Sequence, residues 1–108
     1  MTKTAQLSWL PDPYKFRYGP IIVTLIEIVG GHSYRACWYE ARLSGEGREE
    51  ADAIRALASV IVERIVLLQE RYKKRPLVGE ALETWKTLEA NVVPIERSSW
   101  RDIKGALS

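Results

Sequence analysis

The stretch from Glu46 to Arg75 constrains the fold most, because its pattern predicts one long unbroken helix. Apolar residues recur there at steps of three and four, the spacing of a single helix face: Ile54, Ala58, Ile61, Ile65, Leu68 and Tyr72. At ~1.5 Å per residue the helix would be roughly 40 Å long. A compact domain of about 100 residues has a radius of gyration of only ~13 Å. The helix therefore needs a second helix or a second chain to cover it.

Both ends of this stretch carry helix signals. Negative charges that suit a helix start are Glu49, Glu50 and Asp52. Cations that suit the exposed carbonyls of a helix end are Arg71, Lys73, Lys74 and Arg75, and Pro76 then stops the helix. We interpret Gly45 and Gly47 as residues that free the backbone to turn into the helix.

A second apolar strip on the same helix comprises Leu57, Val60, Val62, Val66 and Leu67. Two strips make burial on one side alone less favourable, so we expect partners on both sides. This predicts a homodimer built on the long helix, on the first strand of the main domain, or on both.

The length and composition predict a single soluble domain. The 108 residues suffice for one core, and 46% hydrophobic with 28% charged residues is ordinary for a globular protein. The net charge of +2 is too small to indicate nucleic-acid binding by itself. One cysteine, no signal-peptide core and no run near the ~18 apolar residues of a membrane span lead us to expect a cytoplasmic protein without membrane contact.

The segment before the long helix predicts an arm followed by a hairpin. Residues 1–20 carry three prolines and are expected to be an extended arm. Residues 21–29 form the strongest strand, and because both its faces are apolar it should be central or covered on both sides. A turn at residues 30–33 leads to a partner strand at 34–40, and residues 41–44 add a short third strand or extend the second.

After Pro76 the sequence predicts a second helix from Gly79 or Glu80 to about Ala90, of the right length to fold back as a helical hairpin. Residues 94–108 are a short tail in which Trp100 and Ile103 could anchor a turn of helix. The expected fold is α+β. It has a small antiparallel sheet of two to three strands, hairpin first, packed on one long and one shorter helix, with residues 21–93 as the domain.

The joint between hairpin and helix resembles the HicB-like antitoxin family. A Tyr34-x-Ala36 pair precedes a joint whose matching residues are Gly45, Gly47, Glu49, Glu50 and Ala51. The second helix, residues 77–88, is similar to a Leu-Gly-x-x-Leu-x-x-x-Trp-x-x-Leu signature of small HicB-like proteins. The resemblance spans roughly residues 21–93.

This resemblance implies a degenerate ribonuclease-H-like fold and an antitoxin that neutralises a small HicA-like ribonuclease toxin. Two departures stand out. The segment from Tyr34 to Glu49 is shorter than usual and lacks a Pro-Gly-Cys-type turn. The tail after Pro94 is too short for the ribbon-helix-helix or helix-turn-helix module that family antitoxins often carry, which argues against operator binding by such a module.

The residues do not support catalysis, so we expect no enzyme activity, metal or cofactor. His32 is the only histidine and lies beside two glycines at a turn, while Cys37 is better explained as a small core residue. The two strands offer only Glu27 and Glu40 as metal-binding carboxylates. Gly45-x-Gly47 lacks the lysine and the spacing of a phosphate-binding loop.

Nucleic-acid binding remains an alternative to protein binding. Its candidate residues are Arg71, Lys73, Lys74 and Arg75, although their place at a helix end already explains their charge. A nucleic-acid-binding regulator and an orphan structural or oligomeric protein therefore stay open beside the antitoxin reading.

Overall fold

The computed structural model describes residues 2–28, 30 and 33–95, so His32 and the expected helical turn at Trp100 and Ile103 lie outside the described residues. The elements in chain order are β1 (Thr2–Leu7), β2 (Tyr14–Phe16), β3 (Ile21–Glu27), β4 (Tyr34–Trp38), the 3₁₀ turn η1 (Tyr39–Ala41), β5 (Leu43–Gly47), α1 (Glu50–Lys74), α2 (Gly79–Asn91) and β6 (Val92–Pro94).

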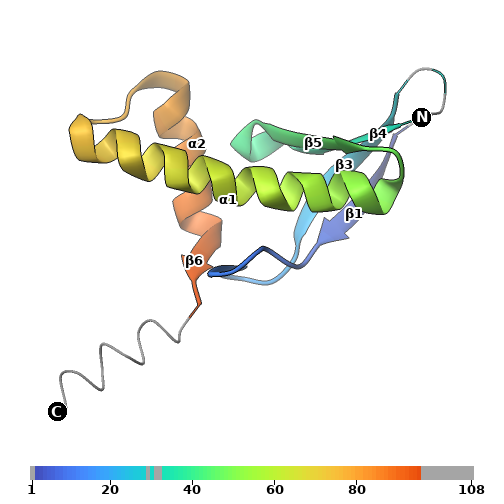
Figure 1. The fold of residues 1–108 in the computed structure, drawn as a ribbon, viewed down its shortest axis with the longest axis horizontal. Helices are drawn as coiled ribbons and strands as arrows, with labels where there is room; N and C mark the ends of the chain where they lie inside the picture. The colour runs from blue at the N-terminus through green and yellow to red at the C-terminus, as the bar shows by residue number, and fades with distance from the viewer. Residues whose placement is uncertain (1, 29, 31–32, 96–108) are drawn as a thin grey trace, which may run out of the picture.

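The core of the fold is a four-stranded antiparallel sheet in the order β1-β3-β4-β5, with α1 lying along one of its faces (Figure 1). The α+β class is therefore confirmed. The expected count of two to three strands, beginning with the hairpin, is wrong. The N-terminal arm supplies the additional strand, since β1 pairs with β3 from Thr2 opposite Ile26 to Leu7 opposite Ile21.

β3 is a central strand, as its apolar sequence predicts, because it lies between β1 and β4. Among the residues that the structure describes, only one of its faces is covered. Val23 and Leu25 face α1 and are 1% and 3% exposed, whereas Ile22 on the opposite face is 59% exposed. The second apolar face of this strand therefore has no cover among the described residues.

A second, two-stranded sheet pairs the short strand β2 with β6, the last described strand. β2 pairs antiparallel with β6, with Tyr14 opposite Pro94 and Phe16 opposite Val92. The ring of Phe16 meets the ring of Trp38 edge to face, with centroids 6.3 Å apart. This aromatic contact packs the small sheet against the main core.

α1 is unbroken, but it begins at Glu50, four residues later than predicted, because Glu46 and Gly47 belong to β5. Most of its predicted apolar face is in the core: Ala58, Ile61, Ile65 and Leu68 are buried and Ile54 is partly buried. Tyr72 is the exception at 61% exposed. The last turns of α1 reach past the point where α2 crosses it (Figure 1).

The second apolar strip of α1 is divided between core and surface. Leu57 is completely buried, Val60 and Val62 are partly buried, and Val66 and Leu67 are 50% and 42% exposed. The described residues thus cover most of the first strip and only part of the second.

α2 packs against both α1 and η1, crossing α1 at a steep angle instead of running back beside it as a hairpin (Figure 1). Its buried Thr84 donates a hydrogen bond from Oγ1 to the carbonyl oxygen of Ala41 at 3.1 Å. Leu88, on the same helix, is 1% exposed. In the described part of the chain, neither helix is long and apolar enough to cross a membrane.

Candidate functional site

The two glycines of the joint allow α1 to lie directly on β5. A Cβ added to Gly45 would lie 2.3 Å from the backbone nitrogen of Leu57, and one on Gly47 would lie 2.5 Å from the Cβ of Asp52. Gly45 and Gly47 are strand residues, and neither adopts a positive φ. Our interpretation that they turn the chain is therefore wrong: they serve close packing of helix on strand.

The other joint residues organise the start of α1. Glu49 caps the helix through its backbone, since its carbonyl oxygen accepts the Ala53 N–H at 3.0 Å. Glu50 forms an ion pair with Lys3 of β1 at 2.8 Å, and this hydrogen bond raises the pKa of the Lys3 ammonium. Ala51 is exposed. Each of these joint residues lies at the helix start, and Glu50 also ties it to the first strand.

The sheet face turned away from α1 is the first candidate site, which we call the open sheet face. Register and burial place on it Thr4, Gln6, Ile22, Thr24, Ile26, Arg35, Cys37, Ser44 and Glu46. Ile22 is its most exposed large apolar side chain. The only charges in this set are Arg35 and Glu46, which pair with each other at 2.6 Å.

Tyr39 extends this face beyond the end of β4. Its side chain lies beside Cys37 and is 64% exposed overall. Partial desolvation of the hydroxyl, together with the neighbouring Cys37 thiol, raises the pKa of Tyr39 above its ordinary value. The free Cys37 thiol itself is buried, in agreement with a packing role.

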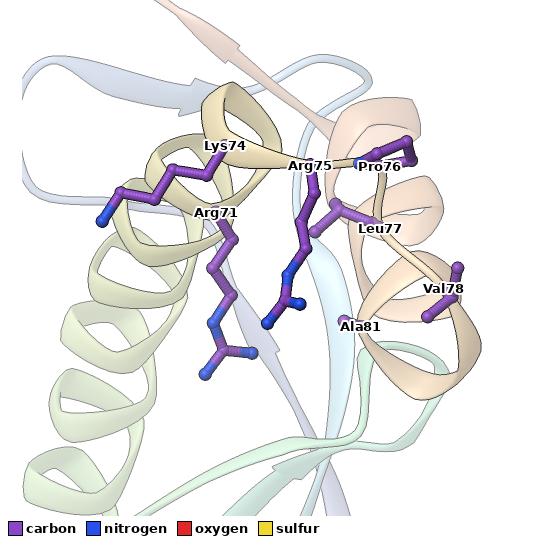
Figure 2. A pocket seen from close by; sticks show the side chains of 7 residues that line it. All are labelled: Arg71, Lys74, Arg75, Pro76, Leu77, Val78 and Ala81. Carbon is purple, nitrogen blue, oxygen red and sulfur yellow. The ribbon is translucent and has the colours of Figure 1, made fainter.

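The second candidate site is a hollow where α1 ends and α2 begins, and Figure 2 shows the side chains around it. Its lining residues are Arg71, Lys74, Arg75, Pro76, Leu77, Val78 and Ala81. A neighbouring hollow shares Arg71 and Ala81 and adds Arg42, Arg64, Leu68, Glu80 and Thr84. We call the two together the basic groove, defined by Arg42, Arg64, Arg71, Lys74 and Arg75.

The structure brings three of the four predicted basic residues into this groove and leaves one out. Arg71, Lys74 and Arg75 line it, whereas Lys73 pairs with Glu70 at 3.1 Å and is not part of the lining. Arg42 and Arg64 were missed. The spacing of seven and then four residues from Arg64 to Arg71 to Arg75 marks one helix face and could have indicated Arg64. Arg42 arrives from the end of η1, which no local pattern predicts.

The carboxylates weighed for metal binding lie on separate elements. Glu27 ends β3, and Glu40 belongs to η1, where its backbone carbonyl accepts a hydrogen bond from Thr87 at 3.2 Å. Within residues 2–28, 30 and 33–95, no three side chains from His, Cys, Asp and Glu gather as a metal site would require.

Comparison of the chain with protein-family models, with curated proteins and with solved structures finds no match. The structure itself defines the class: an α+β protein whose antiparallel sheet is covered by a long helix on one face. Two surface features distinguish it within that class, namely the open sheet face and the basic groove.

Proposed function

We propose that this chain is a non-enzymatic protein-binding module of the HicB-like antitoxin type, and that it forms a homodimer through its open sheet face. The observation that supports this most is Ile22, the second residue of the central strand β3, which is 59% exposed. A central strand with apolar residues on both faces favours cover on both faces. α1 provides one cover, and a second protomer would provide the other.

The charge pattern of the open sheet face favours a second copy as its occupant. In a two-fold dimer the same patch meets itself, so a patch with a net charge would repel its copy. Arg35 and Glu46 neutralise each other at 2.6 Å, and the remaining residues of the face are uncharged. Two such faces can therefore pack as the aligned sheets of a sandwich, about 10 Å apart.

Sedimentation of an Ile22→Glu variant tests this dimer. The wild-type chain should sediment as a dimer and the variant as a folded monomer, because each protomer would bury an unpaired glutamate in the interface. Thr24→Arg, near the centre of the same face, should have the same effect. The matched control is Val66→Glu, which places the same charge on a side chain that is 50% exposed on α1 and should leave the dimer intact.

Two results would contradict the proposal. If the wild-type chain sediments as a monomer, there is no dimer and the proposal is wrong. If the Ile22→Glu variant stays dimeric and the Val66→Glu variant dissociates, the dimer interface lies on α1 and not on the open sheet face. Circular dichroism of each variant separates dissociation from unfolding.

The resemblance to HicB-like antitoxins supports a further partner, a small HicA-like ribonuclease toxin. The toxin partner is inferred from the residues that resemble the family, namely the joint from Gly45 to Ala51 and the signature in residues 77–88. Co-expression with a neighbouring reading frame that encodes a small basic protein tests it. A stoichiometric complex in which the partner's ribonuclease activity is suppressed is expected. Free partner with undiminished activity would refute the toxin step and leave the dimer standing.

A further inference from the structure

The basic groove carries an excess of positive charge that no described carboxylate compensates. Arg42 pairs with Glu80 at 2.9 Å, and Glu80 is the one acidic residue that lines the groove. For the remaining four cations, no ion pair with any described residue is found: Arg64, Arg71, Lys74 and Arg75. This local excess exceeds the net charge of +2 of the whole chain.

Two arginines of the groove, Arg64 and Arg71, lie on one face of α1, and Arg75 comes directly after its last residue. Arg71 follows Arg64 by seven residues and Arg75 follows Arg71 by four. At ~1.5 Å per residue the step from Arg64 to Arg71 is roughly 10 Å along the helix axis. Arg75 is the C-cap, and its backbone N–H donates to the Arg71 carbonyl oxygen at 3.0 Å. Figure 2 shows the side chains of Arg71 and Arg75 extending into the same hollow beside Ala81 of α2. The guanidinium groups thus present a row of forked donors instead of a single point charge.

From this row we infer that the basic groove binds the phosphate backbone of a single-stranded nucleic acid. A strand carries one negative charge per nucleotide on its main chain, and guanidinium forks bind phosphate oxygens in pairs. A concave lining between two helices admits a thin strand more readily than the wide cylinder of a duplex or the flat surface of a bilayer. The site is separate from the open sheet face, because no residue of that face lines the groove.

The residues that line the groove also imply that the affinity does not depend on the base sequence of the nucleic acid. Apart from the cations and Glu80, the groove is lined by apolar side chains and by Thr84. The Thr84 hydroxyl is already committed to the carbonyl oxygen of Ala41. Reading bases requires polar groups that reach base edges. Beyond its cations the groove offers only Glu80, which is already paired with Arg42 at 2.9 Å. Oligouridine and oligoadenine of equal length should therefore bind alike.

Fluorescence anisotropy with a labelled oligouridine of about 12 nucleotides tests the inference. If each of the four cations neutralises one phosphate, log K should fall against log salt with a slope of about −2.8. Between about 50 and 200 mM NaCl the affinity of the wild-type chain should drop about 50-fold. Replacing Arg71→Gln and Arg75→Gln together should reduce the slope to about −1.4 and the drop to about 7-fold.

The matched control removes two positive charges outside the groove. Lys73→Gln with Lys86→Gln lowers the net charge equally, but these lysines pair with Glu70 and Glu83 and do not line the groove. The control should keep the wild-type slope. Both double variants should remain folded and keep the wild-type oligomeric state, so failure here is distinguishable from failure of the dimer.

Four outcomes would overturn the inference. The first is no binding of oligouridine at about 50 mM NaCl. The second is an equal loss of affinity in the groove variant and the control, which would indicate unspecific charge attraction. The third is tighter binding of a duplex than of the single strand. The fourth is equally tight binding of a polyglutamate peptide or of anionic phosphatidylserine vesicles, which would assign the groove to another class of partner.

Discussion

Gly45 of β5 and Leu57 of α1 lie so close that a Cβ on Gly45 would come within 2.3 Å of the Leu57 backbone nitrogen. Real Cβ atoms do not approach backbone atoms at that distance, so any side chain at position 45 requires the helix or the strand to move. Leu57 is fully buried at this crossing. The contact between Gly45 and Leu57 therefore sets how closely α1 packs on the sheet.

Replacing Gly45→Ala should destabilise the fold by about 3 kcal/mol, the upper part of the range for overpacked cores, because the obstacle is backbone. Chemical denaturation measures the free energy of unfolding. Ser59→Ala is the control, since this residue is exposed on α1 and should change stability by no more than about 0.5 kcal/mol. Equal stability of both variants would mean that α1 does not lie on β5 as described.

Because Thr84 donates a hydrogen bond to Ala41, removal of the Thr84 hydroxyl should lower the free energy of unfolding. Thr84 is 5% exposed, and its Oγ1 donates to the Ala41 carbonyl at 3.1 Å. Thr84→Val keeps the shape and removes the donor, so unfolding should become easier by about 1–2 kcal/mol. Ser59→Ala removes an exposed hydroxyl from α1 and should change stability by no more than about 0.5 kcal/mol. A neutral Thr84→Val would show that this bond does not fix α2 to η1.

The ion pair between Lys3 and Glu50 predicts a measurable pKa. Its hydrogen bond raises the pKa of Lys3 above the ordinary 10.5. A raised folded-state pKa contributes stability that is present below 10.5 and lost as pH rises through the folded value. NMR titration of Lys3 should show its pKa falling toward 10.5 in Glu50→Gln. Glu49→Gln removes a charge one residue earlier and should leave the Lys3 pKa raised.

The sequence predicts the parts of this fold that depend on local periodicity. The three- and four-residue spacing of Ile61, Ile65 and Leu68 predicts their burial on one face of α1, and all three are in the core. The β-branched run at residues 21–29 predicts a strand that is central or covered on both sides, and β3 (Ile21–Glu27) is central. In these cases one local pattern determines both the element and its buried face.

Features that depend on distant partners escaped prediction. Thr2–Leu7 has no strong strand pattern and becomes β1 through pairing with β3. Gly45 and Gly47 were expected to turn the chain, because sequence alone does not reveal a helix backbone lying across a strand. Arg42 joins the basic groove only through the packing of η1 beside α2. Tyr72 continues the apolar spacing of α1 yet is exposed, because spacing does not show where the cover ends.

Substitution of Ile65 tests whether the apolar face of α1 is buried in the core of one protomer or forms an interface between two. The sequence predicts that Ile65→Asp dissociates or unfolds the protein, and the structure favours unfolding, since Ile65 is 3% exposed within one protomer. An unpaired buried carboxylate should cost about 5 kcal/mol, comparable to the whole stability of a small domain. Val66→Asp, at a neighbouring residue that is 50% exposed, should stay folded. Circular dichroism and sedimentation of both variants check this. A folded Ile65→Asp monomer of unchanged stability would contradict the burial of this helix face, whereas loss of helical signal in Ile65→Asp alone would support it.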